Sequence, residues 1–237
     1  SLSKEVYPMP VRKKAPEDLT AKKALALEVI RRLKAEYPDA GCTLDYDHAW
    51  QLLVSVRLAA QCTDARVNIV VEELFAKYPS VAALAAAEPE DIEAIVKPCG
   101  LGHSKARDIS ACMRMLRDKY DCRVPNTFEE LLALPGVGRK SANLIMGDVF
   151  GKPAIVTDTH CIRLCNKIGL VDGIKEPQKV EMALWKIIPP EEGSDLCHRF
   201  VMHGRAVCNA RKPECEKCCL KDICRTAREA AGQQAEP

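Results

Sequence analysis

Two residues in the second half of the chain could form an amine–carboxylate pair. Lys140 lies in the first turn of a predicted helix, and Asp158 lies eighteen residues later, just before another predicted helix. The positive end of a helix dipole disfavours a cation at Lys140 and favours the charged carboxylate of Asp158. A neutral amine beside a carboxylate suits nucleophilic attack on carbon and Schiff-base formation. Taken singly, the lysine could instead be a phosphate contact and the aspartate a helix cap.

Residues 134–142, LPGVGRKSA, predict a tight hairpin between two helices. Gly136 and Gly138 allow the backbone to approach another surface closely, and Val137 between them is expected to face inward. The turn directs unpaired N–H groups and the start of the second helix toward one point, which is suited to binding phosphate without contacting a base. Arg139 adds a positive charge beside the turn. The alternative is an interhelical turn that binds no ligand.

Four cysteines near the end of the sequence are separated by six, two and five residues: Cys208, Cys215, Cys218 and Cys224. The start of the sequence lacks the apolar core of a secretion signal, so four thiols this close indicate a metal or a cluster rather than disulfides. Their spacing leaves both structural zinc and an iron–sulfur cluster open. Cys219 adjoins the third of them and is either a spare thiol or a competing ligand.

The bulk composition is that of an ordinary globular protein. Of 237 residues, 47% are hydrophobic and 29% are charged. No apolar run is long enough to span a bilayer, so we expect no membrane association and a protein that stays inside the cell. The net charge of +2 does not indicate a partner. Basic residues gather toward both ends of the chain, which permits phosphate contact but is equally compatible with a solvated surface.

The elements that would position these residues are helices throughout, so the predicted fold class is all-α. Apolar periodicity, caps and prolines predict helices over residues 19–37, 47–58, 64–78, 104–120, 139–150 and 159–168, and further helices that begin at residues 80, 89, 127, 177 and 191. The one strand-like run, residues 154–156, is too short to build a sheet. Residues 1–17 and those after Arg228 have the composition of loose tails.

Several of these motifs together resemble the endonuclease III family, over roughly residues 20–225. They are the LPGVGRK hairpin, the Asp-Thr-His segment of residues 158–160 and the Cys-x6-Cys-x2-Cys-x5-Cys spacing. The resemblance implies a six-helix barrel with a helix–hairpin–helix motif at residues 42–152. A second domain would be built from residues 1–41 and 153–237. It also implies a 4Fe–4S cluster on Cys208, Cys215, Cys218 and Cys224, and DNA contacts through Gly136, Val137, Gly138 and Arg139.

The same resemblance implies a bifunctional DNA glycosylase and AP lyase that acts as a monomer on damaged double-stranded DNA. Lys140 would attack C1′ of the damaged nucleotide. Asp158 would activate the lysine and stabilise positive charge on the sugar. The resulting imine would eliminate the 3′-phosphate by β-elimination after an oxidised pyrimidine has been removed.

Two further residues would help to extrude the base from the duplex. In the family resemblance, Gln61 offers an amide to the orphaned partner base and Leu101 is an apolar wedge. From the residues alone, Gln61 could be a helix-end polar residue and Leu101 a core leucine. Gly102 departs from the tyrosine frequent in the family. His160 could either line the substrate pocket or be a structural histidine.

Two other functions compete with this interpretation. A non-catalytic helix–hairpin–helix DNA-binding protein would keep the hairpin and the cysteines without the chemistry, but the presence of both Lys140 and Asp158 argues against it. A monofunctional adenine-mispair glycosylase typically lacks this lysine and carries an upstream glutamate. Here the matching upstream position is Val56.

Overall fold

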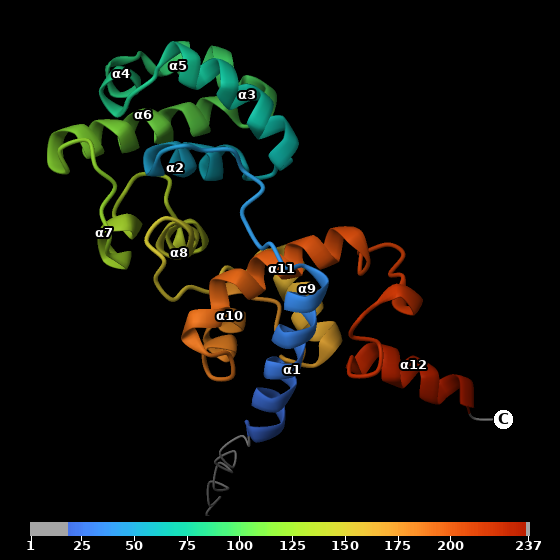
Figure 1. Cartoon of the computed structure of the whole chain (residues 1–237). Coiled ribbons are helices and arrows are strands. Elements are labelled where there is room, and N and C mark those ends of the chain that lie inside the picture. Colours follow the sequence, from blue (N-terminus) through green and yellow to red (C-terminus); the bar gives the residue numbers. More distant parts are fainter. Residues whose placement is uncertain (1–18, 236–237) are drawn as a thin grey trace, which may run out of the picture.

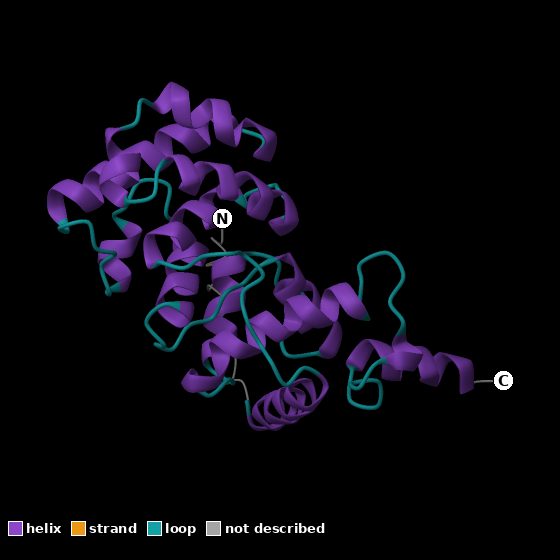
Figure 2. Ribbon diagram, turned by 45° about the horizontal axis from the view of Figure 1, so that its top comes forward, coloured by secondary structure: helices purple, strands orange, loops and turns teal. Residues whose placement is uncertain are grey.

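The structure, a computed structural model, describes residues 19–235. They form twelve α-helices and no strand, which confirms the predicted all-α class (Figures 1 and 2). Residues 1–17, predicted to be a loose tail, lie outside the described residues. Among residues 19–235, no helix combines the length and the apolar character that crossing a membrane requires.

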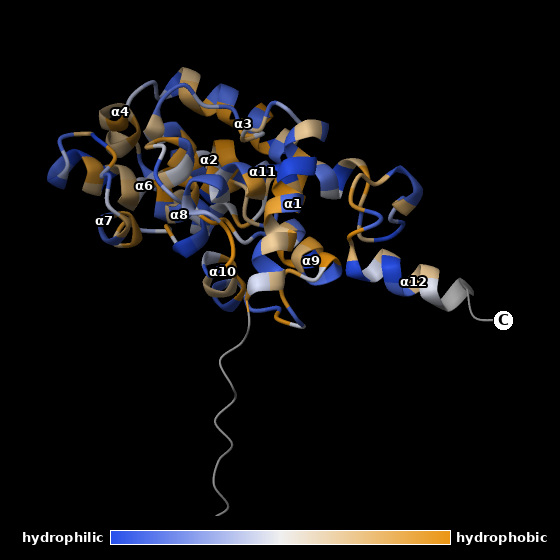
Figure 3. Cartoon of the chain, turned by 60° about the horizontal axis from the view of Figure 1, so that its bottom comes forward, coloured by the Kyte–Doolittle hydropathy of each residue, from blue (hydrophilic) through white to orange (hydrophobic). Residues whose placement is uncertain are grey.

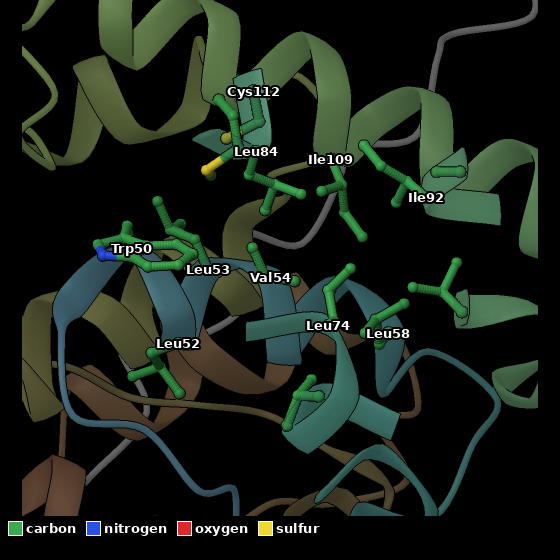
Figure 4. Close-up of a cluster of buried hydrophobic side chains, with 14 of the residues drawn as sticks. Trp50, Leu52, Leu53, Val54, Leu58, Leu74, Leu84, Ile92, Ile109 and Cys112 are labelled. Carbon is green, nitrogen blue, oxygen red and sulfur yellow. The ribbon is translucent and has the colours of Figure 1, made fainter. Parts of the chain in front are cut away.

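The first of two hydrophobic cores is built by the middle of the chain. Its helices are α2 (Ala49–Leu58), α3 (Asp64–Lys77), α4 (Val81–Ala86), α5 (Pro89–Val96), α6 (Gly102–Lys119), α7 (Phe128–Leu132) and α8 (Arg139–Asp148). Helix α2 is central, because no side chain from Trp50 to Ser55 is more than 8% exposed. Figure 4 shows Leu53 and Val54 of this helix among the buried side chains, together with Leu84 of α4 and Ile109 of α6.

The second core joins the two ends of the described chain. Its helices are α1 (Thr20–Glu36), α9 (Thr159–Ile168), α10 (Pro177–Trp185) and α11 (Gly193–Ala206). Lys22 of α1 forms an ion pair with Asp172 at 2.7 Å, and Arg32 donates to the carbonyl of Cys219 at 2.9 Å. These contacts fix the first helix against the C-terminal segment.

The segment after Arg228 is a correction to the sequence-based expectation of a loose tail. It belongs to helix α12 (Arg225–Ala235), which projects from the other helices and carries mostly polar residues (Figures 1 and 3). A helix forms there because its first residues are anchored. Arg225 donates to the carbonyl of Asn166 at 2.8 Å, and Thr226 donates to that of Lys167 at 2.7 Å.

Helix starts were predicted well wherever a local cap sets them. Thr127 caps α7 through the N–H of Glu130, and Asp158 caps α9. The predicted cap Asp47 is wrong by one residue. His48 is the N-cap of α2, because the Gln51 side chain reaches back and accepts from the backbone N–H groups of both Asp47 and His48, at 2.7 and 3.0 Å.

The two cores are joined along helix α8. Arg139 at its start forms a two-point ion pair with Glu181 of α10, at 2.7 and 2.8 Å. Asp148 at its end lies 2.6 Å from Nε2 of His198 in α11. The side chain of Glu181 is only 3% exposed. The contacts of Arg139 and Asp148 fix both ends of α8 relative to the second core, and with them Lys140 near its start.

Candidate active site

An open cavity of about 380 Å³ lies where the two cores meet. The first core contributes Lys140 of α8 and Gln61 of the loop after α2. The second contributes Asp158 and His160 at the start of α9, and Arg205 of α11. A second cavity of about 450 Å³ adjoins the first and shares Gly41, Cys42 and His198 with it. The structure thus brings together the predicted amine and carboxylate, and a predicted DNA contact, in one cavity.

Lys140 and Asp158 each occupy the helix start that the sequence predicted. Lys140 is the second residue of α8, and its side chain is exposed where it lines the cavity. Asp158 is half-buried, and its Oδ1 accepts the backbone N–H of Cys161 at 2.7 Å. This hydrogen bond holds the carboxylate at the start of α9 and uses Oδ1 alone, so Oδ2 takes no part in the cap. Asp158 is therefore a helix cap that also lines the cavity, and its predicted catalytic role stays a prediction.

His160 lines the cavity and is also fixed by packing. Gly204 of α11 leaves room for its ring, because a Cβ built on that glycine would lie 2.6 Å from Nδ1. Burial lowers the pKa of His160, while the neighbouring Asp158 carboxylate opposes that shift. The imidazole is therefore mainly neutral at pH 7. Its two predicted roles, in the pocket and in the structure, are combined.

The hairpin has the backbone geometry that its glycines suggested. Gly136 has a φ of +76°, and an added Cβ would lie 2.8 Å from Cβ of Asp108. Gly138 is extended, with nothing within 4 Å of an added Cβ. Val137 is half-buried against the first core, as predicted. Arg139 is engaged with Glu181 and lies over the ring of Phe128, 4.9 Å from its centroid, so its predicted DNA contact stays a prediction.

Gln61 and Leu101 share an unusual backbone conformation. Their φ angles are +55° and +49°, in the left-handed region that few residues other than glycine adopt. Leu101 is 57% exposed and not a core leucine, although it does not line the cavity. Gln61 is exposed and does line it. Each side chain is therefore presented to solvent at the tip of a strained loop.

The four predicted ligand cysteines line one small cavity of about 50 Å³: Cys208, Cys215, Cys218 and Cys224. Lys167 and Lys221 line the same cavity, where their charges would offset those of thiolates. Cys219 is not among its lining residues. His203 links Cys218 to the first helix, because its Nε2 lies 3.2 Å from Sγ and its Nδ1 lies 2.8 Å from the hydroxyl of Tyr37. In the described residues, no group of three or more His, Cys, Asp or Glu side chains is arranged to hold a metal ion.

Sequence reasoning missed several residues of the larger cavity. Arg205 carries a positive charge to its rim, 3.6 Å from Oδ2 of Asp64. His198 lies in the wall between the two cavities. Both come from α11, and only the packing of that helix against α8 brings them to the site. The basic composition of the C-terminal part was the single signal that could have pointed to Arg205.

An all-α fold with a glycine hairpin beside a cavity lined by a lysine and an aspartate defines the class of helix–hairpin–helix DNA glycosylases. Comparison with known proteins agrees. Residues 54–190 match the family described as HhH-GPD superfamily base excision DNA repair protein. Endonuclease III of Synechocystis sp. is 42% identical over 210 residues, covering 88% of this chain and 95% of that protein.

Solved structures give the same result. A non-covalent endonuclease III–DNA complex has 39% identity and a TM-score of 0.83, covering 89% of this chain and 98% of that one. A trapped endonuclease III–DNA covalent intermediate has the same identity and TM-score, covering 88% and 98%. The chain therefore belongs to the endonuclease III family. It is a bifunctional DNA glycosylase and AP lyase of base-excision repair, and it binds DNA.

Proposed function

We propose that the enzyme removes oxidised or ring-saturated pyrimidines from double-stranded DNA and then cleaves 3′ to the abasic site. The observation that carries this proposal is the shared cavity of Lys140 and Asp158, which is large enough to admit a turned-out nucleotide. Both residues come from one chain, which supports a complete site in a monomer. Val56, also in the lining, leaves no acid at the position that an adenine-mispair glycosylase would use.

In this mechanism, the neutral amine of Lys140 attacks C1′ of the damaged nucleotide, and the bond from C1′ to the base breaks. The carboxylate of Asp158 accepts a proton from the amine and stabilises the positive charge that develops on the sugar. The departing base carries away the electron pair of its bond to C1′ and takes a proton from water. The C1′–O4′ bond then opens, and O4′ takes the proton that Asp158 accepted. The protonated lysine–sugar imine that results makes the C2′ proton acidic. Loss of that proton expels the 3′-phosphate by β-elimination, and water releases the lysine.

DNA would be held by groups on either side of this cavity. Gly136, Val137, Gly138 and Arg139 form the hairpin that would contact phosphates. Gln61 would face the orphaned partner base and Leu101 would fill the gap in the stack. The exposed, left-handed conformation of both residues supports these roles.

The cysteine cavity would hold a 4Fe–4S cluster. Four thiols line one cavity, which matches the number of thiolate ligands that such a cluster takes, although among the described residues they are not drawn together around a single ion. When bound, the cluster would cross-link the loop that follows α11. We further propose that the first core, within residues 42–152, is one domain and that the two chain ends form the other.

Mutation of single cysteines tests the cluster. Cys218→Ser should abolish bound iron and sulfide together with the broad visible absorption of the protein. Cys219→Ser is the matched control, because that residue lies outside the cavity lining. This variant should keep the full content of iron and sulfide. Loss of iron in both variants, or in neither, would contradict the proposed ligand set.

The catalytic proposal is tested by a nicking assay on duplexes with one defined lesion or one abasic site. The wild-type protein should excise oxidised pyrimidines and nick the product strand. Lys140→Gln should bind the same duplexes with similar affinity and leave them intact. A wild-type protein that binds these duplexes but never nicks them would contradict the proposed catalytic site. Nicking by the Lys140→Gln variant would refute the assignment of the nucleophile.

A further inference from the structure

One fully buried lysine has no part in the proposed chemistry. Lys105, in the first turn of α6, is 0% exposed, and it is among the largest fully buried side chains of the described residues. Burying an ammonium group is costly unless all its donors are satisfied. Burial lowers the pKa of Lys105, the shift expected when a cation is removed from water. Because a buried ammonium group is costly, Lys105 is expected to have a role beyond filling space in the core.

The ammonium group of Lys105 is fully engaged by three backbone carbonyls. Its Nζ donates to Leu58 at 2.8 Å, to Ala60 at 2.7 Å and to Cys99 at 2.9 Å. An ammonium group has three donors, so these bonds saturate it. Leu58 is the last residue of α2, where the helix dipole is negative and favours a cation, and Ala60 lies in the turn that follows. Cys99 ends the 3₁₀ turn Lys97–Cys99 that precedes α6.

Two of the three bonded carbonyls, those of Ala60 and Cys99, lie within two residues of a strained loop tip. Gln61 follows Ala60 in the chain, and Leu101 lies two residues after Cys99. The two tips are forty residues apart in sequence, yet a single ammonium group ties both to the same helix. Residues in the left-handed region persist only where their surroundings fix them. Lys105 supplies that fixation for both tips at once.

A neighbouring pair strengthens the same junction. Arg57 of α2 donates to Asp108 of α6 at 2.7 Å and to Ser104 at 3.2 Å. Asp108 in turn lies against Gly136 of the hairpin. The end of α2, the start of α6 and the hairpin are thus one connected unit. The two loop tips therefore have a fixed place relative to the phosphate-binding turn.

We infer that Lys105 is a positioning residue that sets the spacing of Gln61 and Leu101, so that both enter the duplex together when the damaged base leaves it. This inference rests on the roles proposed for those two side chains. It adds that neither works alone, because one buried cation fixes both. Lys105 itself does not contact DNA. Its contribution is to hold the loops of Gln61 and Leu101 rigidly at one fixed spacing.

The test measures insertion without requiring chemistry. In the Lys140→Gln background, a duplex carries 2-aminopurine opposite an abasic-site analogue, and its fluorescence rises when the stack is disturbed. Lys105→Met should lose at least half of this rise while binding the duplex within about threefold. Lys119→Met, an exposed lysine of the same helix, is the control and should behave as the parent. Because no bond is cleaved, failure of the proposed catalysis would leave this readout intact.

A mutant cycle then separates positioning from general damage to the fold. With Lys140 present, Lys105→Met should reduce excision from duplex DNA by roughly 10–100-fold, as misplacement by about 1 Å can do. Lys105→Gln, which keeps two donors, should recover part of the loss. In a protein that already carries Gln61→Ala and Leu101→Ala, Lys105→Met should add less than about threefold. A full additional loss in that background, or an unchanged fluorescence rise, would overturn the inference.

Discussion

Asp158 combines two functions that substitution can separate. Its carboxylate caps α9 through the N–H of Cys161, and it also lines the cavity that contains Lys140. Asparagine is as good a cap as aspartate, but it carries no charge and accepts no proton. We therefore predict that Asp158→Asn keeps the thermal stability of the wild-type protein and loses most of its excision rate.

The companion variant Asp158→Ala removes the cap as well. It should lose the same activity and in addition about 1 kcal/mol of stability. Thermal unfolding and single-turnover excision, measured on both variants, check the two predictions together. Full activity of Asp158→Asn would remove the carboxylate from the mechanism.

His160 makes the free energy of unfolding of the protein depend on pH. Its pKa is lowered in the folded state by burial, so below the unfolded value of about 6.5 the unfolded chain binds more protons at this residue. Stability contributed by the neutral ring is present above pH 6.5 and is lost as the pH falls. We predict that His160→Gln shows a shallower loss of stability between pH 7 and pH 5 than the wild-type protein. Denaturant unfolding at a series of pH values measures the difference, and parallel curves would contradict it.

At the scale of elements, the two hairpin glycines should respond differently to the same substitution. Gly136→Ser would place a side chain at φ +76° against Asp108, at an expected cost of about 1–3 kcal/mol. Gly138→Ser meets open space in extended backbone at a helix N-cap, where serine is favoured, and should change stability by less than about 0.5 kcal/mol. Thermal unfolding of the two variants side by side is the measurement. Equal losses would refute this account of the turn.

Much of the element scale could be predicted because the signals are local. Thr127, Asp158 and Gly169 each mark a helix end through their own hydrogen bonds or φ angle. The error at the start of α2 came from Gln51, whose side chain selects the cap from one turn further on. The helix after Arg228 was missed because its anchors, the carbonyls of Asn166 and Lys167, come from a distant part of the sequence.

The candidate site shows the same limit of sequence reasoning. Lys140 and Asp158 were predicted because each stands at a helix start that its neighbours define. Arg205 and the partnership of Arg139 with Glu181 depend on how helices pack, and spacing along the chain carries no signal for them. The fixation of Gln61 and Leu101 by Lys105 is a tertiary contact of the same kind.

For the whole molecule, the pair of Arg139 and Glu181 is a two-point polar contact between the two cores. Glu181 also accepts from Asn143 and Trp185, both at 3.1 Å, so its removal would take the acceptor from four donor nitrogens of three side chains. We predict that Glu181→Ala lowers the free energy of unfolding by about 2–3 kcal/mol. This is less than for a fully buried ion pair, because water partly screens the exposed side chain of Arg139.

The control for this joint is a second glutamate beside the same helix. Glu176 makes an exposed ion pair with Lys179 at 3.3 Å, and Glu176→Ala should cost less than about 1 kcal/mol. If the Glu181→Ala variant unfolds at the same temperature as the Glu176→Ala variant, the buried pair does not hold the cores together.

The whole account depends on one amine at the junction of the two cores. Borohydride reduction during a reaction on abasic duplex DNA would convert a lysine–sugar imine into a stable amine, and digestion with mass spectrometry then identifies the modified residue. We predict that the sugar remnant is found on Lys140 and on no other residue. A remnant on a different lysine, or the absence of any adduct from a protein that nicks the duplex, would contradict the proposed mechanism.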